Sequence, residues 1–268
     1  MDSAKSADSE RAEHAKGRDE RLVEAQADAT TLESWWPQRI LIGAALWLAG
    51  AALLFGLGLY FAAHRTATLP GDKGILALVQ HIQQPLLVGL INLASDANWP
   101  QPAAITVFAV TLVLLFARRF RAAICALAVG FIADFTSFFL LNDWVKRIRP
   151  KDISLHTFQG IGAWSYPSGH VVHVTAFYGF LYYLAWHEQR FHPSWIPALR
   201  VVQVVCGYFI VFIGLSRLLE DDHWSSDVLA GYLLGAMMLA AAIVLYHALA
   251  LAWLHREGLR VRLGLRHG

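Results

Sequence analysis

Six apolar runs separated by short polar segments dominate the chain from residue 40 onwards. They lie at about 40–63, 103–117, 122–141, 167–186, 201–215 and 228–254. A helix needs about 20 apolar residues to cross a bilayer, so most of these runs are long enough, although the second is short. The pattern predicts an all-α integral membrane protein, a six-transmembrane-helix bundle over residues 37–256.

The segments outside these runs differ in character. Residues 1–36 hold almost no large apolar side chain before Leu22, which predicts a disordered tail and does not fit a signal peptide. Residues 64–101 are polar at first and then weakly amphipathic, which predicts an outer loop with one or two interfacial helices. Residues 257–268 form a short basic tail.

Composition supports a membrane location. The chain is 56% hydrophobic and only 16% charged, whereas a soluble domain carries about 25% charged residues. The ten tryptophans and eight tyrosines suit the membrane interface. A net charge of +2 does not point to a nucleic-acid partner. Cys125 and Cys206 fall in apolar runs, so we expect buried free thiols and no disulfide.

Arginine is unevenly distributed between the segments that join the runs. Arginines occur in the 118–121 turn, the 187–200 connector and the 256–266 terminus. The 64–101 loop, by contrast, holds one arginine, Arg65, and one lysine, Lys73. The positive-inside rule then places both termini in the cytoplasm. The polar motifs described next are expected on the opposite, periplasmic or extracellular, face of a bacterial plasma membrane.

Three polar motifs lie at the ends of the apolar runs on that face. They are Lys146-Arg147-Ile148-Arg149-Pro150, then Tyr166-Pro167-Ser168-Gly169-His170, then Ser216-Arg217 followed by His223 and Asp227. Guanidinium groups bind phosphate in forks and stay charged, although a lone arginine near a membrane more often reaches toward lipid headgroups. Together the motifs supply a phosphate cradle with a nucleophile and an acid. Their place between apolar runs predicts a lipid phosphate.

The third motif suggests a nucleophile. Asp227 follows His223 by four residues, so both side chains share a face if the last helix begins near His223. The carboxylate would then accept a hydrogen bond from one imidazole nitrogen and leave the other free to attack. The alternative is a helix-capping Asp227 beside an interfacial histidine. Neither spacing nor composition decides between them.

The second motif suggests an anion site and an acid. Ser168 either caps the following helix or, with Gly169, lets the helix N-terminus receive a phosphate oxygen. His170 stands beside this turn and is placed to protonate a leaving oxygen.

These motifs, in this order, resemble the type 2 phosphatidic acid phosphatase (PAP2) superfamily, which also includes the vanadium haloperoxidases. The family pattern is Lys-x6-Arg-Pro, Pro-Ser-Gly-His and Ser-Arg-x5-His-x3-Asp, and the second and third parts match in full. The resemblance covers about residues 80–250. It implies the membrane-bound lipid phosphatase branch, because six apolar runs suit a lipid substrate.

The resemblance also implies a mechanism and site residues. His223 forms a phosphohistidine, Asp227 orients it, and His170 protonates the leaving group and later activates water. Arg149, Arg217, Ser168 and Gly169 hold the phosphate oxygens, where negative charge accumulates. The implied enzyme is a metal-independent phosphatase that needs no cofactor.

The substrate and the fate of the phosphoryl group stay open. Candidate substrates are an isoprenyl diphosphate such as undecaprenyl diphosphate, phosphatidic acid and phosphatidylglycerophosphate. The alternatives are a lipid-to-lipid phosphotransferase and a non-catalytic membrane protein with a family-like site. The sequence shows no convincing metal-ligand spacing, and the carboxylates at 220–222 are expected to form a solvated rim. Oligomeric state is left open.

The first motif departs from the family pattern. The family lysine would fall at position 142, where this chain has Asn142. Lys146 lies one helical turn later, and with no glycine or proline in 131–149 the helix is expected to continue to about Arg149. Residues 142, 146 and 149 would then share a face. Lys146 is predicted to supply the missing ammonium, or Asn142 a neutral hydrogen bond, whereas Arg147 points elsewhere.

Overall fold

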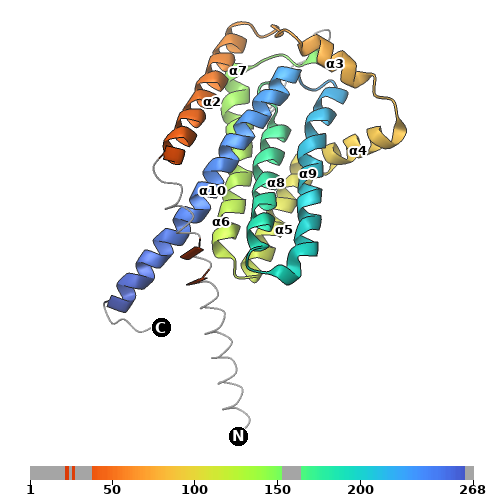
Figure 1. Cartoon of the computed structure of the whole chain (residues 1–268). Helices are drawn as coiled ribbons and strands as arrows, with labels where there is room; N and C mark the ends of the chain where they lie inside the picture. The colour runs from red at the N-terminus through yellow and green to blue at the C-terminus, as the bar shows by residue number, and fades with distance from the viewer. Residues whose placement is uncertain (1–21, 24–25, 28–37, 153–163, 263–268) are drawn as a thin grey trace. The chain divides into compact units, whose positions relative to one another are not determined.

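The computed structural model describes residues 22–23, 26–27, 38–152 and 164–262, and every regular element in this part of the chain is a helix (Figure 1). Most of the expected tail at 1–36, and residues 153–163 and 263–268, lie outside the described residues. Residues 44–243 form one compact unit, which holds the three motifs, and the segments on either side of it belong to a second unit.

Each apolar run corresponds to a helix in the structure. The helices are α2 (Gln38–Ala63), α5 (Pro100–Phe116), α6 (Phe120–Asp134) continued by the π-helix η1 (Phe135–Asn142) and α7 (Asp143–Val145), α8 (Gly169–Glu188), α9 (Ile196–Leu219) preceded by the short η3 (Pro193–Trp195), and α10 (Ser225–Arg262). The all-helical class is therefore confirmed. α10 also continues past residue 256, where the helical domain was expected to end.

The lengths of the described helices do not confirm the expected six membrane spans. Four stretches among the described residues are long and apolar enough to cross a bilayer: Ile40–Ala63, Phe120–Val145, Pro193–Leu219 and Ser225–His255. α5 has 17 residues, which is short for a span. α8 has 20 residues, most of them buried within the bundle. The six-span count stays a prediction.

The central helix of residues 44–243 is α8, which packs against α6 and α9 (Figure 1). It also lies against α10 at small residues. A Cβ on Gly235 would lie 2.6 Å from the Cβ of Thr175, and one on Gly231 would lie 2.9 Å from the carbonyl oxygen of Ser168. Both contacts need glycine. They bring the start of α8, with the second motif, beside the start of α10, with the third.

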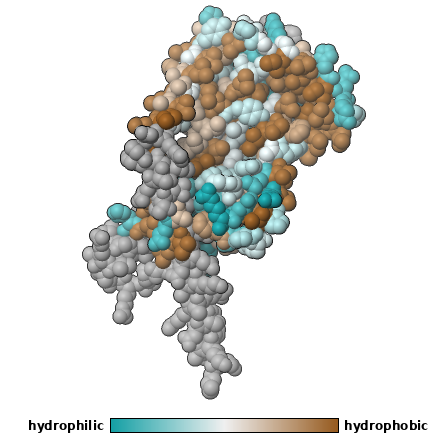
Figure 2. Space-filling model, in the orientation of Figure 1, coloured by the Kyte–Doolittle hydropathy of each residue, from teal (hydrophilic) through white to brown (hydrophobic). Residues whose placement is uncertain are grey.

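Large apolar side chains cover the flank of this unit. Leu112, Phe116, Val204 and Leu229 are all more than half exposed. Figure 2 shows apolar side chains over much of the visible flank, with polar ones gathered toward the ends of the helices. Such a surface suits lipid better than water. By contrast, Cys125 and Cys206 are buried free thiols, as expected.

The first loop contains two helices, α3 (Asp72–Gln80) and α4 (Pro85–Asp96). Their axes are bent by 119°, and both pack against α9. Pro85 starts α4, and the side chain of Gln84 accepts a hydrogen bond from the backbone N–H of Leu87 at 2.6 Å. The expected helices in 64–101 are therefore present. Their location at the membrane interface stays a prediction.

The expectation that the third apolar helix continues to about Arg149 is wrong. α7 ends at Val145, and Lys146 takes a left-handed conformation with φ of 54°. The chain then turns inward: the backbone N–H of Ile148 donates to the carbonyl of Arg65 at 2.9 Å. Residues 142, 146 and 149 consequently do not share a helical face, which removes the geometric basis for replacing the family lysine by Lys146.

Candidate active site

Backbone hydrogen bonds join the three motifs at one end of the bundle. The N–H of Ser168 donates to the carbonyl of Asp227 at 3.1 Å, which ties the second motif to the third. The N–H of Lys151 donates to the carbonyl of Asp221 at 3.3 Å, which ties the segment after the first motif to the third. Within the third motif, the N–H of His223 donates to the carbonyl of Arg217 at 3.3 Å. Residues far apart in sequence thus form one site.

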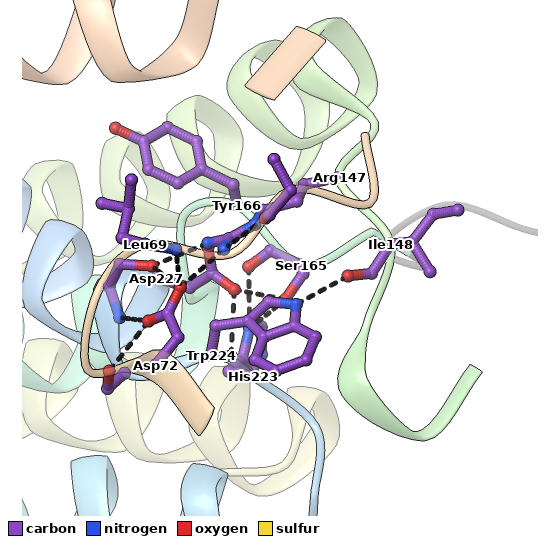
Figure 3. Close-up of polar contacts among 12 residues, drawn as sticks. Leu69, Asp72, Arg147, Ile148, Ser165, Tyr166, His223, Trp224 and Asp227 are labelled. Carbon is purple, nitrogen blue, oxygen red and sulfur yellow. Dashed lines mark hydrogen bonds and ion pairs between the residues drawn. The ribbon is translucent and has the colours of Figure 1, made fainter. Parts of the chain in front are cut away.

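His223 is buried in a defined orientation (Figure 3). Its Nδ1 lies 2.7 Å from the carbonyl oxygen of Ser165. A carbonyl oxygen only accepts hydrogen bonds, so Nδ1 carries the proton in the neutral ring. Nε2 is then the nitrogen with the free lone pair, which is the property required of a nucleophile.

Asp227 and His223 both contact Ser165. α10 begins at Ser225, after His223, so the two residues do not share a helix. One oxygen of Asp227, Oδ2, accepts hydrogen bonds from the hydroxyl of Ser165 and from the backbone N–H of Trp224, the latter at 3.0 Å. The expected direct hydrogen bond between Asp227 and His223 is therefore corrected to a bridged one. The helix-capping interpretation is also confirmed, since Asp227 satisfies an N–H at the helix start.

The second motif offers two buried polar atoms. The hydroxyl of Ser168 and Nε2 of His170 are buried and make no hydrogen bond within the described part of the chain. Ser168 occupies the N-cap position of α8, yet its side chain forms no capping hydrogen bond. A Cβ on Gly169 would lie 2.5 Å from the ring of Phe138, so this position needs glycine. The His170 ring lies beside the rings of Trp99 and Phe138.

Three cations converge on Asp222. Nη1 of Arg149 and Nη1 of Arg217 each lie 3.2 Å from a different oxygen of this carboxylate. Nζ of Lys151 contacts the same oxygen as Arg149. Asp222 is only 8% exposed, so the expectation of a solvated rim is wrong for this residue. The cationic groups of the site are already gathered around one anion.

The other carboxylates of the 220–222 run have separate partners. Both oxygens of Glu220 lie 2.9 Å from Nη2 of Arg217, which also donates to the hydroxyl of Ser95. A side-chain oxygen of Asp221 accepts from Gln80 at 3.0 Å. Arg217 is thereby held from several directions.

Asn142 holds the backbone before the second motif. Its Nδ2 donates to the carbonyl of Trp164 at 2.8 Å, and its Oδ1 accepts from the N–H of the same residue at 3.0 Å. The donor and the acceptor of the Asn142 amide are therefore both bonded to the backbone of Trp164. Lys151, rather than Lys146, is the lysine in contact with the Asp222 cluster.

Among the site residues, Arg147 differs most from the position expected from the sequence. Its side chain has no exposed surface and forms ion pairs with Asp227 and with Asp72 of α3 (Figure 3). The expectation that Arg147 points away from the site is wrong, because the helix ends before it. Ser165 and Asp72 were not identified at all. Neither residue lies in one of the three motifs, and in the sequence Asp72 is a single acidic residue within the 64–101 loop.

Burial and the nearby cations together shift the pKa values of His223 and Asp222. Burial, followed by the charges of Arg149 and Arg217, holds the pKa of His223 well below 6.5. The ring is therefore neutral near pH 7. Burial alone would raise the pKa of Asp222, but Arg149, Lys151 and Arg217 outweigh it and keep the pKa below its usual value. Asp222 is accordingly ionised.

Comparison with known proteins points to the same family as the motifs. Residues 122–250 match the model of the PAP2 superfamily. Phosphatidylglycerophosphatase B of Bacillus subtilis (strain 168) is 27% identical over 191 residues, which cover 69% of this chain and 88% of that protein. The fold is similar to the crystal structure of a transmembrane PAP2 type phosphatidylglycerolphosphate phosphatase from Bacillus subtilis, with a TM-score of 0.55, 22% identity, and coverage of 71% of this chain and 92% of that one.

The family match begins in α6 and ends in α10, so it includes all three motifs in their expected order. The similar solved structure supports the helical membrane fold independently of the motifs. Four helical stretches among the described residues have the length and apolar character of membrane spans. The chain is an integral membrane protein, and its residues 122–250 are similar to the PAP2 superfamily.

Proposed function

We propose that this protein is a lipid phosphatase that removes a phosphoryl group from a lipid phosphomonoester or diphosphate through a phosphohistidine on His223. One observation supports this most: the neutral imidazole of His223, with a fixed free nitrogen, directly follows Asp222 in the chain, and Asp222 contacts the cations Arg149, Lys151 and Arg217. Nucleophile and cradle together suit an in-line displacement at phosphorus.

In the proposed first step, the phosphate oxygens take the place of the Asp222 carboxylate among the three cations. The N-terminus of α8 and the hydroxyl of Ser168 add hydrogen-bond donors. Nε2 of His223 attacks phosphorus, and the bond from phosphorus to the lipid oxygen breaks. The electron pair goes to that oxygen, which takes a proton from His170 in its imidazolium form, a form that the bound phosphate anion favours.

In the second step, His170 removes a proton from a water molecule, which attacks the phosphohistidine. The bond between phosphorus and Nε2 breaks, and inorganic phosphate leaves. During both steps the imidazole of His223 carries positive charge while it is bonded to phosphorus. Asp227, acting through Ser165, stabilises that charge. These residues supply binding, nucleophile and proton transfer from the protein itself, which supports a metal-independent reaction.

The relatives favour a glycerophospholipid monoester. The similarity to phosphatidylglycerophosphatase B supports phosphatidylglycerophosphate as the first substrate to test. Phosphatidic acid and undecaprenyl diphosphate are the comparison substrates, since all three present a phosphate next to a lipid. We further propose that the site opens to the outer face of a bacterial plasma membrane.

The test is phosphate release by the purified protein in detergent, with each of the three lipids and with EDTA or vanadate added. We expect release that survives EDTA, is inhibited by vanadate and is abolished in His223→Ala. Product analysis separates hydrolysis from transfer to a second lipid. Loss of activity with EDTA and recovery with Mg²⁺ would contradict the proposed mechanism.

A further inference from the structure

Arg147 is a buried cation that joins the first loop to the start of α10 (Figure 3). Its Nη1 lies 2.5 Å from Oδ1 of Asp227, and its Nη2 lies 2.8 Å from Oδ2 of Asp72. The guanidinium carbon lies 3.6 Å from the ring centroid of Phe61. Because the side chain of Arg147 has no exposed surface, it cannot touch a substrate. Any effect on the reaction must pass through the residues that it holds.

Asp72 completes this arrangement from the loop side. Its Oδ1 accepts hydrogen bonds from the hydroxyl of Ser225 and the backbone N–H of Ser226, both at 2.8 Å. These are the first two residues of α10, where N–H groups have no partner within the helix. Its Oδ2 also accepts from the backbone N–H of Leu69 at 2.8 Å. Asp72 thereby holds Arg147 and caps the helix that carries Asp227.

Two routes connect Arg147 to His223, and both pass through Ser165. On the side-chain route, Arg147 holds Asp227, whose other oxygen accepts from the Ser165 hydroxyl. On the main-chain route, the carbonyl of Arg147 accepts from the N–H of Ser165 at 2.9 Å. The carbonyl of Ser165 in turn accepts from Nδ1 of His223. The orientation of the imidazole is thus fixed by contacts that begin at Arg147.

We propose that Arg147 and Asp72 form a positioning clamp for the His223 nucleophile. This inference rests on the proposed function, because it concerns the same site. The clamp fixes Asp227 and Ser165 and takes no part in phosphate binding, which the Asp222 cluster performs. A displacement of a reacting group by about 1 Å can cost roughly 100-fold in rate. Loosening the clamp should therefore lower turnover and leave phosphate binding almost unchanged.

The charge arrangement explains why arginine is needed at this position. Arg147 faces two buried carboxylates and donates separate N–H groups to each. It also donates to the hydroxyl of Ser226 at 2.8 Å and to the carbonyl of Ala67 at 2.9 Å. A lysine has one ammonium on a flexible stem and cannot reproduce this planar fork. Arg147→Lys therefore keeps the charge and removes the geometry.

The experiment compares Arg147→Lys, Ser165→Ala and the double variant with the parent protein. Turnover and KM are measured on dioctanoyl phosphatidic acid, and the number of competent sites is counted by calorimetric binding of vanadate. Arg119→Lys is the matched control, because Arg119 forms an ion pair at 2.8 Å with Glu188 outside the three motifs. Asp72→Asn tests the clamp from the loop side in case Arg147→Lys is poorly folded.

We expect Arg147→Lys to lower kcat per competent site by roughly 10- to 100-fold, with KM and vanadate affinity close to those of the parent. Asp72→Asn should lower kcat in the same way, and Arg119→Lys should not. Combined with Ser165→Ala, the loss should be smaller than the product of the single losses, since both changes break the same connection.

Two results would overturn the clamp. One is unchanged kcat per competent site in both Arg147→Lys and Asp72→Asn. The other is loss of activity that matches the loss of vanadate-binding sites, which would show a purely structural role. A parent protein that binds vanadate and releases no phosphate from any lipid would instead contradict the proposed function. The two failures are thereby distinguished.

Discussion

Oδ2 of Asp222 lies 3.2 Å from Nη1 of Arg217, inside the group of cations proposed to bind phosphate. Its other oxygen contacts Arg149 and Lys151. The protein therefore holds an anion of its own among the cations, and a substrate phosphate has to replace it. This relationship leads to the first prediction.

Asp222→Asn should tighten inhibition by inorganic phosphate. The amide keeps the shape of the side chain but no longer neutralises the three cations, so a competing anion gains charge-assisted hydrogen bonds at lower cost. A gain of about 1.4 kcal/mol corresponds to a tenfold lower inhibition constant. The inhibition constant is measured against a short-chain lipid phosphate. Weaker inhibition in the variant would show that Asp222 organises the cations instead of competing for them.

Lys151 should matter more than Lys146 for phosphate binding. The ammonium of Lys151 contacts Asp222 together with Arg149, whereas Lys146 follows the end of α7 in a left-handed conformation. Loss of one phosphate contact costs a few kcal/mol in a buried site and less in an exposed one, so Lys151→Ala should lower kcat/KM by roughly 10- to 100-fold. Lys146→Ala is the matched control. A larger loss in Lys146→Ala would restore the original assignment of Lys146.

The pH profile should show a nucleophile with a low pKa. Burial, Arg149 and Arg217 hold the pKa of His223 well below 6.5. Protonation inactivates the nucleophile, so activity due to His223 is retained as pH falls through 6.5 and lost only at lower pH. In Arg149→Gln one nearby cation is gone, the pKa rises, and the acid limb of kcat/KM should move to higher pH.

Each acid limb is read relative to that variant's own plateau, with the same substrate throughout, so that ionisation of the substrate phosphate affects both profiles equally. Arg119→Gln, outside the three motifs, serves as the control and should leave the limb unchanged. A limb in Arg149→Gln at the same pH as in the parent would contradict the electrostatic account of His223.

The helical class and the three motifs could be predicted from the sequence, because apolar runs and short motifs depend on residues that are neighbours in the chain. The end of the third helix could not be predicted in this way. No glycine or proline interrupts 131–149, yet the helix ends at Val145, and Arg147, two residues later, forms ion pairs with Asp72 and Asp227. Those partners are distant in sequence, so the contact leaves no local signal.

The same reason explains the errors within the site. The spacing of His223 and Asp227 fits a shared helical face, but Ser165, from another segment, lies between their polar atoms. The carboxylates at 220–222 have the composition of a solvated rim. Only the folded arrangement shows that Asp222 is surrounded by cations contributed by other segments.

The orientation in the membrane can be tested with two single cysteines. Lys73 lies exposed on α3, next to Asp72, and Arg190 lies exposed just after α8. The positive-inside rule places the first outside and the second in the cytoplasm. An impermeant thiol reagent should label Lys73→Cys in intact cells and Arg190→Cys only after lysis. The native Cys125 and Cys206 are buried, so background should be low. The reverse pattern would overturn the topology.

The most direct test of the central claim is to trap the phosphoenzyme. The purified protein is mixed with a radiolabelled aryl phosphate, whose good leaving group departs without a proton from His170, and is quenched in alkali, in which phosphohistidine survives. His170→Ala should accumulate label, because the water attack that removes the phosphoryl group is slowed, and His223→Ala should acquire none. Peptide mapping should place the label on His223. Phosphate release without any trapped label, or label on a residue other than His223, would contradict the account.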